Sequence, residues 1–87
     1  MLRISEIELN GEAATLRLEG RLVGTLVAEV ESVCEGHLAS GHLLRLDLAD
    51  LSFADRAAIT LLNALRGRGV ALTNCSPFLT EELKHSV

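Results

Sequence analysis

The sequence predicts a small α/β domain with a four-stranded mixed sheet, helices packed mainly on one face, and the element order β-β-α-β-α-β-α. Two observations carry this prediction. Asn10-Gly11 separates two runs of alternating apolar and polar residues, which is typical of a tight hairpin turn. Beyond the hairpin, strand patterns alternate with helical patterns, which favours parallel strands joined by right-handed crossovers. Residues 1–87 are expected to form a single domain.

The first half of the chain is expected to hold the hairpin and one helix. Arg3–Leu9 is the predicted first strand, and Ala14–Glu19 is the second, antiparallel to it, because apolar and polar residues alternate in both. The connection Arg21–Gly24 leads to a helix that Thr25 can cap and that runs to about residue 39. Its apolar stripe consists of Leu26, Val27, Val30, Val33, Cys34 and Leu38.

The central segment, Leu43–Leu65, is expected to form a buried strand, a short polar turn and an amphipathic helix. Leucines alternate with Arg45 and Asp47 in the strand, and its apolar content favours a central position in the sheet. Asp55 suits the N-cap of the helix, because its carboxylate can accept hydrogen bonds from unpaired backbone N–H groups. The apolar stripe of this helix consists of Ala58, Ile59, Leu61, Leu62 and Leu65.

The last part of the chain is expected to form a short strand and a short helix. Val70–Asn74 has the composition of a strand. Ser76 can cap the helix, and Pro77 is favoured at the first helical position because its missing N–H would be unpaired there in any case. The side chains expected to pack this helix against the core are Phe78, Leu79 and Leu83.

Composition and charge argue against several classes of function. The net charge of −4 and the absence of Trp and Tyr argue against nucleic-acid binding, which needs basic patches and favours stacking side chains. No apolar run approaches the roughly 18–20 residues that span a bilayer, so no direct membrane insertion is expected. The first residues lack the pattern of a signal peptide. Cys34 and Cys75 have no zinc-binding spacing and are expected to be reduced thiols of a cytoplasmic protein.

Three carboxylates, Asp47, Asp50 and Asp55, surround the predicted end of the central strand, the edge at which open α/β sheets bind ligands. Their oxygens could hold Mg²⁺, as a phospho-aspartate enzyme or a receiver-type switch requires. Such a site also needs a cation to meet the phosphoryl group, and the lysine expected after the next strand is missing. We therefore interpret the acids as a helix cap, a member of a strand-face pair and a solvated turn residue, with a metal switch as the alternative.

No other side chains predict catalysis or a metal site. His37 and His42 are expected to be solvated surface residues, without the spacing of metal ligands. No serine lies in a nucleophile elbow, and Gly67-Arg68-Gly69 follows a helix and so is not a nucleotide-binding loop. The chain is therefore expected not to be an enzyme and to require neither cofactor nor metal.

A surface remains as the candidate site. The Arg21–Gly24 loop and the Asp55 turn should lie near each other, because both follow neighbouring parallel strands. On composition alone, a protein-binding patch and an ordinary loop rim are equally consistent with these residues. The predicted partner-binding surface consists of Arg21, Leu22, Val23, Gly24, Ala54, Asp55, Arg56 and Ala57.

The segment LDLADLSFADRAAITLL resembles the signature of STAS domains, the anti-sigma factor antagonist family. In that family a strand ending in Asp-Leu leads to a Phe-x-Asp-Ser-Ser-Gly turn and an apolar helix; here Asp47-Leu48, Phe53 and Asp55 match. Glu19-Gly20-Arg21-Leu22 resembles the first strand-to-helix passage of the family, and Cys75-Ser76-Pro77 matches the start of its last helix. The resemblance covers nearly the whole chain and implies the STAS fold.

The resemblance implies a regulator of transcription that acts by partner switching. In the family an anti-sigma kinase-like ATPase phosphorylates the first Ser of the turn, and the unphosphorylated domain binds that kinase and frees a sigma factor. Here Arg56 occupies the phosphoacceptor position and cannot take a phosphate. The domain is therefore expected either to bind its partner constitutively or to bind a different, acidic partner.

Other members of the family imply a second possibility. They serve as subunits of membrane-associated ABC complexes, including lipid-transport systems, so an ABC ATPase subunit is the alternative partner. The sequence also allows a homo-oligomer.

Overall fold

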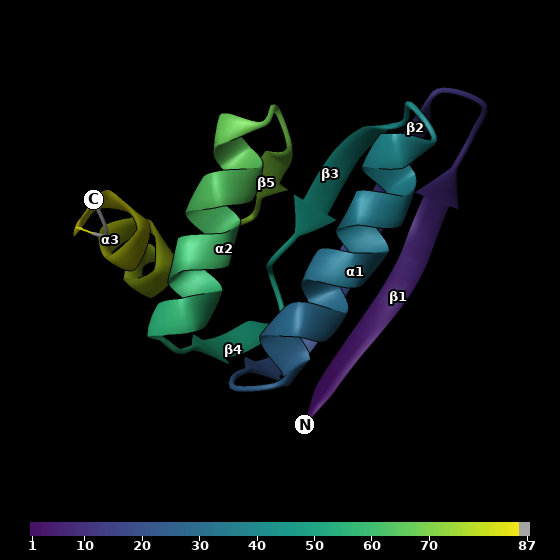
Figure 1. Ribbon diagram of the computed structural model, residues 1–87. Helices are drawn as coiled ribbons and strands as arrows, with labels where there is room; N and C mark the ends of the chain where they lie inside the picture. The colour runs from purple at the N-terminus through teal and green to yellow at the C-terminus, as the bar shows by residue number, and fades with distance from the viewer. Residues whose placement is uncertain (86–87) are drawn as a thin grey trace.

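The computed structural model describes residues 1–85, which form five strands and three helices (Figure 1). In chain order the elements are β1 (Leu2–Leu9), β2 (Ala13–Leu22), α1 (Leu26–Ala39), β3 (Leu43–Asp47), β4 (Leu51–Ala54), α2 (Arg56–Gly67), β5 (Ala71–Thr73) and α3 (Pro77–His85).

The strands form one mixed sheet in which β2 is the longest member. The order is β1-β2-β3-β5: β1 is antiparallel to β2, whereas β2 with β3 and β3 with β5 are parallel. β4 runs parallel to the far end of β2 and lies off this path. The predicted mixed sheet is thus confirmed. The predicted count of four strands is wrong, because part of the expected turn is the additional strand β4.

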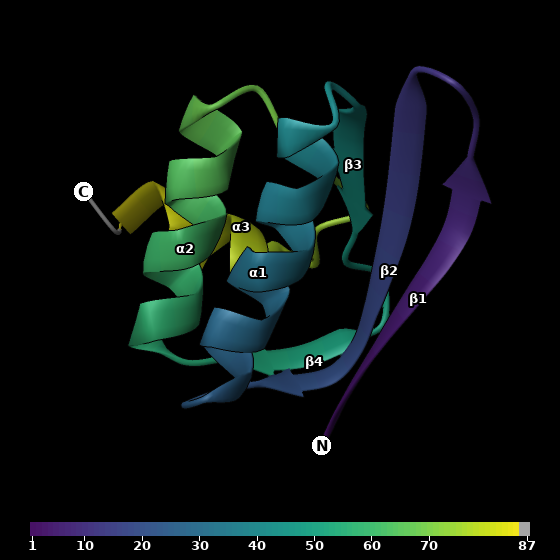
Figure 2. The same cartoon turned by 45° about the vertical axis from the view of Figure 1, so that its right-hand side comes forward.

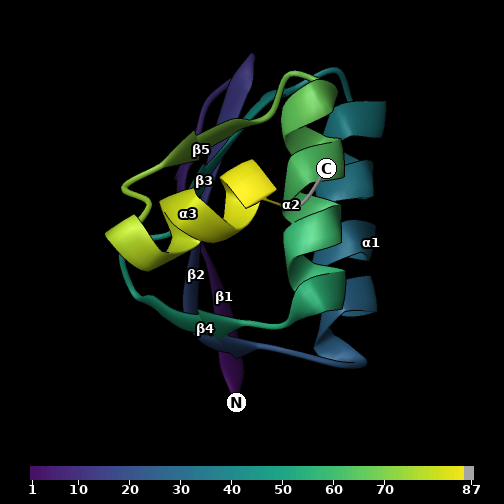
Figure 3. The same ribbon diagram turned by 90° about the vertical axis from the view of Figure 1, so that its left-hand side faces the viewer.

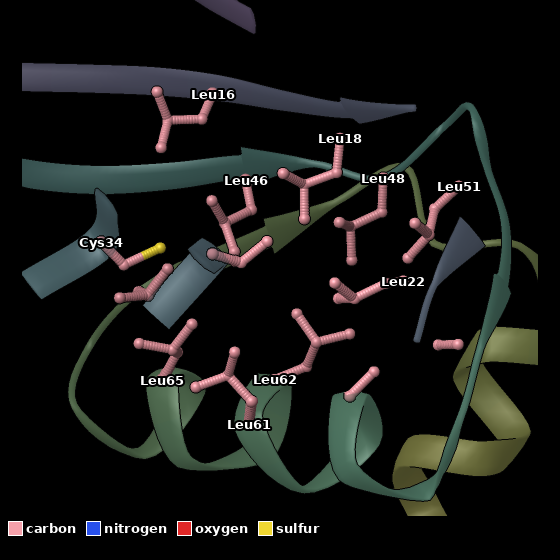
Figure 4. Close-up of a cluster of buried hydrophobic side chains, with 14 of the residues drawn as sticks. Leu16, Leu18, Leu22, Cys34, Leu46, Leu48, Leu51, Leu61, Leu62 and Leu65 are labelled. Atoms are coloured by element: carbon pink, nitrogen blue, oxygen red, sulfur yellow. The ribbon is translucent and has the colours of Figure 1, made fainter. Parts of the chain in front are cut away.

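The helices cover the sheet as the sequence predicts, mainly on one face. Helices α1 and α2 lie side by side against that face (Figures 1 and 2). Helix α3 lies next to α2, between β5 and β4 (Figure 3). The core lies between these helices and the sheet, where leucines of β2 and β3 meet those of α2 (Figure 4). Its largest fully buried side chains are Leu16, Leu18, Leu22, Leu46, Leu48, Leu62, Leu65, Leu79, Val30 and Cys34.

The helix termini agree in part with the caps expected from the sequence. Asp55 caps α2 by accepting a hydrogen bond from the backbone N–H of Ala58, 2.9 Å away. Ser76 caps α3 in the same way, with its hydroxyl 3.2 Å from the backbone nitrogen of Leu79. Thr25 occupies the N-cap position of α1, but its side chain makes no capping hydrogen bond. Phe78, expected to pack against the core, is 47% exposed.

The thiols and histidines differ in how closely they match expectation. Cys34 is buried and Cys75 half-buried, and both are free. The expectation of solvated histidines is wrong for His37 and His42, which are half-buried and approach each other to 3.1 Å between their Nδ1 atoms. The reason is that the turn after α1 folds His42 back onto its last residues. No helix in residues 1–85 is long and apolar enough to cross a membrane.

Candidate functional site

The candidate site forms where β2 stops pairing with β3 and begins to pair with β4. Residues 13–17 of β2 pair with β3, and from Gly20 onward β2 pairs with β4. Gly20 makes this change with a φ of +103°, and a Cβ at this position would lie 2.2 Å from the carbonyl oxygen of Met1. The backbone nitrogen of Arg21 donates to the same oxygen at 3.0 Å. A residue without a side chain is therefore required where the strands diverge.

Asp55 links the two segments of the predicted surface. Its Oδ1 accepts from the backbone N–H of Ala58, and its Oδ2 accepts from that of Gly24, each at 2.9 Å. Its own backbone nitrogen donates to the carbonyl of Leu22 at 3.1 Å. These bonds place the loop before α1 against the start of α2, as expected from neighbouring parallel strands. The Gly24 N–H, followed by that of Ala58, holds the pKa of the Asp55 carboxyl below its ordinary value.

Two of the eight predicted surface residues lie in the core instead. Leu22 is fully buried and Ala54 is 4% exposed. They are paired neighbours on β2 and β4, and their side chains point toward the helices. The prediction placed them in loops, whereas both belong to strands. The other six are accessible: Arg21, Gly24, Arg56 and Ala57 are exposed, and Val23 and Asp55 are half-buried.

Phe53 belongs to this surface, although the sequence analysis used it only as part of the motif. It pairs with Arg21 across β4 and β2, and the guanidinium carbon of Arg21 lies 4.9 Å from the centre of its ring. The ring is 37% exposed. A cation over an aromatic face is attracted to it, so Phe53 restrains an otherwise mobile cation. Recognising residues 51–54 as a strand beside β2 would have revealed this pair.

Arg56 is the first residue of α2 and is exposed. The nearest hydroxyl-bearing residues on either side of it along the chain are engaged with the backbone. Ser52 donates from Oγ to the carbonyl of Gly20 at 2.8 Å, and Thr60 donates from Oγ1 to the carbonyl of Arg56 at 3.0 Å. The surface at the start of α2 therefore presents a guanidinium group at the position for which the resemblance to STAS domains implies a serine.

The carboxylates considered as a metal site have separate partners. Asp47 accepts from the backbone N–H of Ala49 at 3.0 Å and from Nδ2 of Asn74 at 3.1 Å, and Arg17 Nε lies 3.6 Å away. These contacts, led by the Ala49 N–H, lower the pKa of Asp47. Asp50 is exposed. Among the side chains of residues 1–84, no three from His, Cys, Asp or Glu are placed to hold a metal ion together.

The comparisons with known proteins point to one fold. No protein-family model matches the chain, and no curated protein matches it in sequence. Among solved structures, the chain is similar to the anti-sigma factor antagonist SpoIIAA in its unphosphorylated form, with a TM-score of 0.72 and 20% sequence identity. The match covers 97% of this chain and 82% of that one. The chain has a STAS-like fold. At this level of identity the likeness is one of architecture, and it confirms the fold that the motif implied.

Proposed function

We propose that this chain is a small, non-catalytic, protein-binding regulatory domain that acts as an anti-sigma factor antagonist without the phosphorylation switch. The observation that carries the proposal is the exposed Arg56 at the first position of α2, directly after the capping Asp55. The likeness in fold to an anti-sigma factor antagonist supports this functional class. The geometry around Asp55 and Arg56 supports the start of α2 as the place where the partner binds.

The surface has the properties of a pre-organised protein contact. Asp55 holds Gly24 and the start of α2 in a fixed relation through two backbone hydrogen bonds. Gly24 and Ala57 are exposed and small, so a partner can approach the backbone closely. Arg21 is held over Phe53. Little side-chain freedom is lost when a partner binds such a surface, and arginine and aromatic residues are enriched among those that contribute most to binding.

The positive charge of Arg56 favours a partner that presents an acidic segment. A cation at the start of a helix adds to the positive end of the helix dipole. The carboxylate of Asp55 is already engaged by N–H groups of Gly24 and Ala58. The guanidinium group is therefore available to an incoming carboxylate, with which it can form paired hydrogen bonds. We propose an ATPase of the anti-sigma kinase class as the partner, bound constitutively because residue 56 cannot be phosphorylated.

Affinity capture from the cytosol of the source cell tests this proposal. The baits are the wild-type chain, Arg56→Asp, and Arg45→Asp as a control with the same charge change at an exposed position on β3. We expect wild type and Arg45→Asp to retain a kinase-like ATPase, and Arg56→Asp to bind the purified ATPase at least about tenfold more weakly. Recovery of an ABC ATPase or another membrane-complex subunit would instead favour the transporter-subunit alternative.

Phosphorylation tests the missing switch separately. With the captured ATPase and ATP, the wild-type chain is expected to gain no phosphate, whereas Arg56→Ser restores a hydroxyl group beside Asp55 and is expected to gain one. Intact-mass measurement distinguishes the two proteins. A phosphate on Ser52 or Thr60 of the wild-type chain would contradict the proposal.

A further inference from the structure

A cavity of about 460 Å³ lies on a part of the molecule that the proposed partner surface does not use. It is bounded by β5, α3 and the last turn of α2, which lie next to one another in Figure 3. Its volume falls within the roughly 300–1,000 Å³ typical of small-molecule sites. The lining residues are Arg66, Val70, Ala71, Leu72, Cys75, Thr80, Leu83 and Lys84.

The cavity has an apolar floor and a polar rim. Val70 is 2% exposed and Leu83 is 4% exposed, and both belong to the hydrophobic core. Leu72 is half-buried and packs against the same core. The exposed side chains of Thr80 and Lys84 come from α3. An alkyl group placed on this floor would leave water without forcing any buried polar group to lose its partner.

The charges around the cavity differ from those of the chain as a whole. The sequence has 12 acidic residues and 8 Lys and Arg, yet the lining contains Arg66 and Lys84 and no Asp or Glu. The Arg66 guanidinium group donates to Oδ1 of Asn63, which restrains its position at the rim. Burial raises the pKa of the Cys75 thiol, and the nearby positive charge of Arg66 opposes that effect. Arg66 and Lys84 thus place positive charge at the rim of the cavity, where it attracts an anion.

We propose that this cavity binds an amphipathic carboxylate. A short alkyl chain packs on Val70, Leu72 and Leu83, and the carboxylate accepts hydrogen bonds from Arg66 and Lys84. A simple inorganic anion would leave the apolar floor in water, and a neutral hydrocarbon would make no use of the two cations. A ligand with both parts matches the whole lining. This binding site is independent of the proposed partner surface.

Octanoate is the probe for this proposal, with 1-octanol and acetate as controls that lack the charge or the chain. Backbone amide spectra recorded at pH 7 are expected to show saturable shifts at residues 70–75 and 80–84, with a dissociation constant on the order of a millimolar or below. The alkylation rate of Cys75 gives a second readout, because its thiol lines the cavity. Octanoate is expected to slow that reaction severalfold, whereas Cys34 is fully buried and reports any unfolding.

Substitutions of Arg66 and Lys84 test whether these cations bind the carboxylate of octanoate. Arg66→Gln and Lys84→Gln are each expected to weaken octanoate binding at least about fivefold, since each removes a charge-assisted hydrogen bond. Arg3→Gln, at an exposed position on β1 at the opposite edge of the sheet, removes the same charge away from the cavity and is expected to change nothing. Circular dichroism of each variant verifies that the fold is intact. The proposal is overturned if octanoate gives no saturable shift up to about 10 mM, if 1-octanol binds equally well, or if Arg3→Gln weakens binding as much as Arg66→Gln.

Discussion

Replacing Gly20 with alanine is expected to destabilise the protein more than any other glycine-to-alanine change in this chain. Gly20 has a φ of +103°, which L-residues rarely adopt. The added Cβ would also lie 2.2 Å from the Met1 carbonyl oxygen, a backbone atom that cannot rotate away. Relief requires the start of β1 to move, and that movement stretches the hydrogen bond from Arg21 to Met1.

The size of the effect follows from these two contributions. Placing alanine at positive φ costs about 1–2 kcal/mol, and weakening one backbone hydrogen bond costs about 1 kcal/mol. With the remaining steric contact, the free energy of unfolding should fall by about 2–4 kcal/mol. A domain of this length has a total stability of roughly 4–13 kcal/mol, so the variant should lose a large fraction of it.

Urea denaturation followed by circular dichroism measures this loss. With a slope of about 1–2 kcal/mol per molar urea, the midpoint should fall by about 2 M. Two other glycines separate the contributions. Gly41 has a φ of +82° but open space around its Cβ position, so Gly41→Ala should cost only about 1–2 kcal/mol. Gly11 has open space and no positive φ, so Gly11→Ala should change stability by less than about 0.5 kcal/mol.

The relative stabilities of the three variants test this explanation of Gly20. If Gly20→Ala and Gly41→Ala cost the same, the approach to Met1 contributes nothing. If Gly20→Ala is as stable as wild type, the backbone at Gly20 does not have the described conformation, and the transfer of β2 from β3 to β4 is misplaced.

Three further predictions concern burial and ionisation. Leu22→Ala should cost about 3 kcal/mol in urea denaturation and Val23→Ala less than about 1 kcal/mol, because only the first is fully buried; equal costs would contradict the core position of Leu22. Burial raises the pKa of the Cys34 thiol to about 11, so iodoacetamide at pH 8 should modify Cys75 in the folded protein and Cys34 only after unfolding, as peptide mapping would reveal. The pKa of Asp47 is lowered by folding, so its ionised form stabilises the fold above about pH 4 and this stabilisation is lost as the pH falls through the folded pKa. Asp47→Asn should therefore be less stable than wild type at pH 6, and the difference should shrink as the pH falls below about 4; a difference that stays constant as the pH falls would refute the assignment.

Elements whose ends have their own local signals could be predicted from the sequence. Asn10 accepts from the backbone nitrogens of Glu12 and Ala13 within the hairpin, at 3.0 and 2.9 Å. Asp55 and Ser76 cap their helices through side-chain oxygens. In each case the interaction spans two or three residues, so composition and spacing contain the information that determines it.

Strand β4 could not be predicted in this way. Its two buried residues, Leu51 and Ala54, are three apart, which matches a helix and not a strand. The pairing of β4 with β2 shifts register between Gly20 and Arg21, which brings Leu51 and Ala54 to the core from one short segment. That shift depends on contacts between residues about 31 positions apart. The same missing pairing explains why Leu22 and Ala54 were assigned to the surface and why the contact of Arg21 with Phe53 was not foreseen.

The presence of an arginine at position 56 is not explained by a contribution to folding, in contrast to the residues around it. Asp55 is explained by the two N–H groups that it accepts, and Ala58 by its burial in the core. Arg56 is exposed, stands at the positive end of the helix dipole, and is the only charged residue in a first turn that has no acidic side chain. Electrostatics at that position favour an acidic or neutral residue. Helix electrostatics therefore disfavour a cation at this exposed position, which supports the proposal that Arg56 serves partner binding. Charge reversal at Arg56 is accordingly expected to weaken partner binding without weakening the fold.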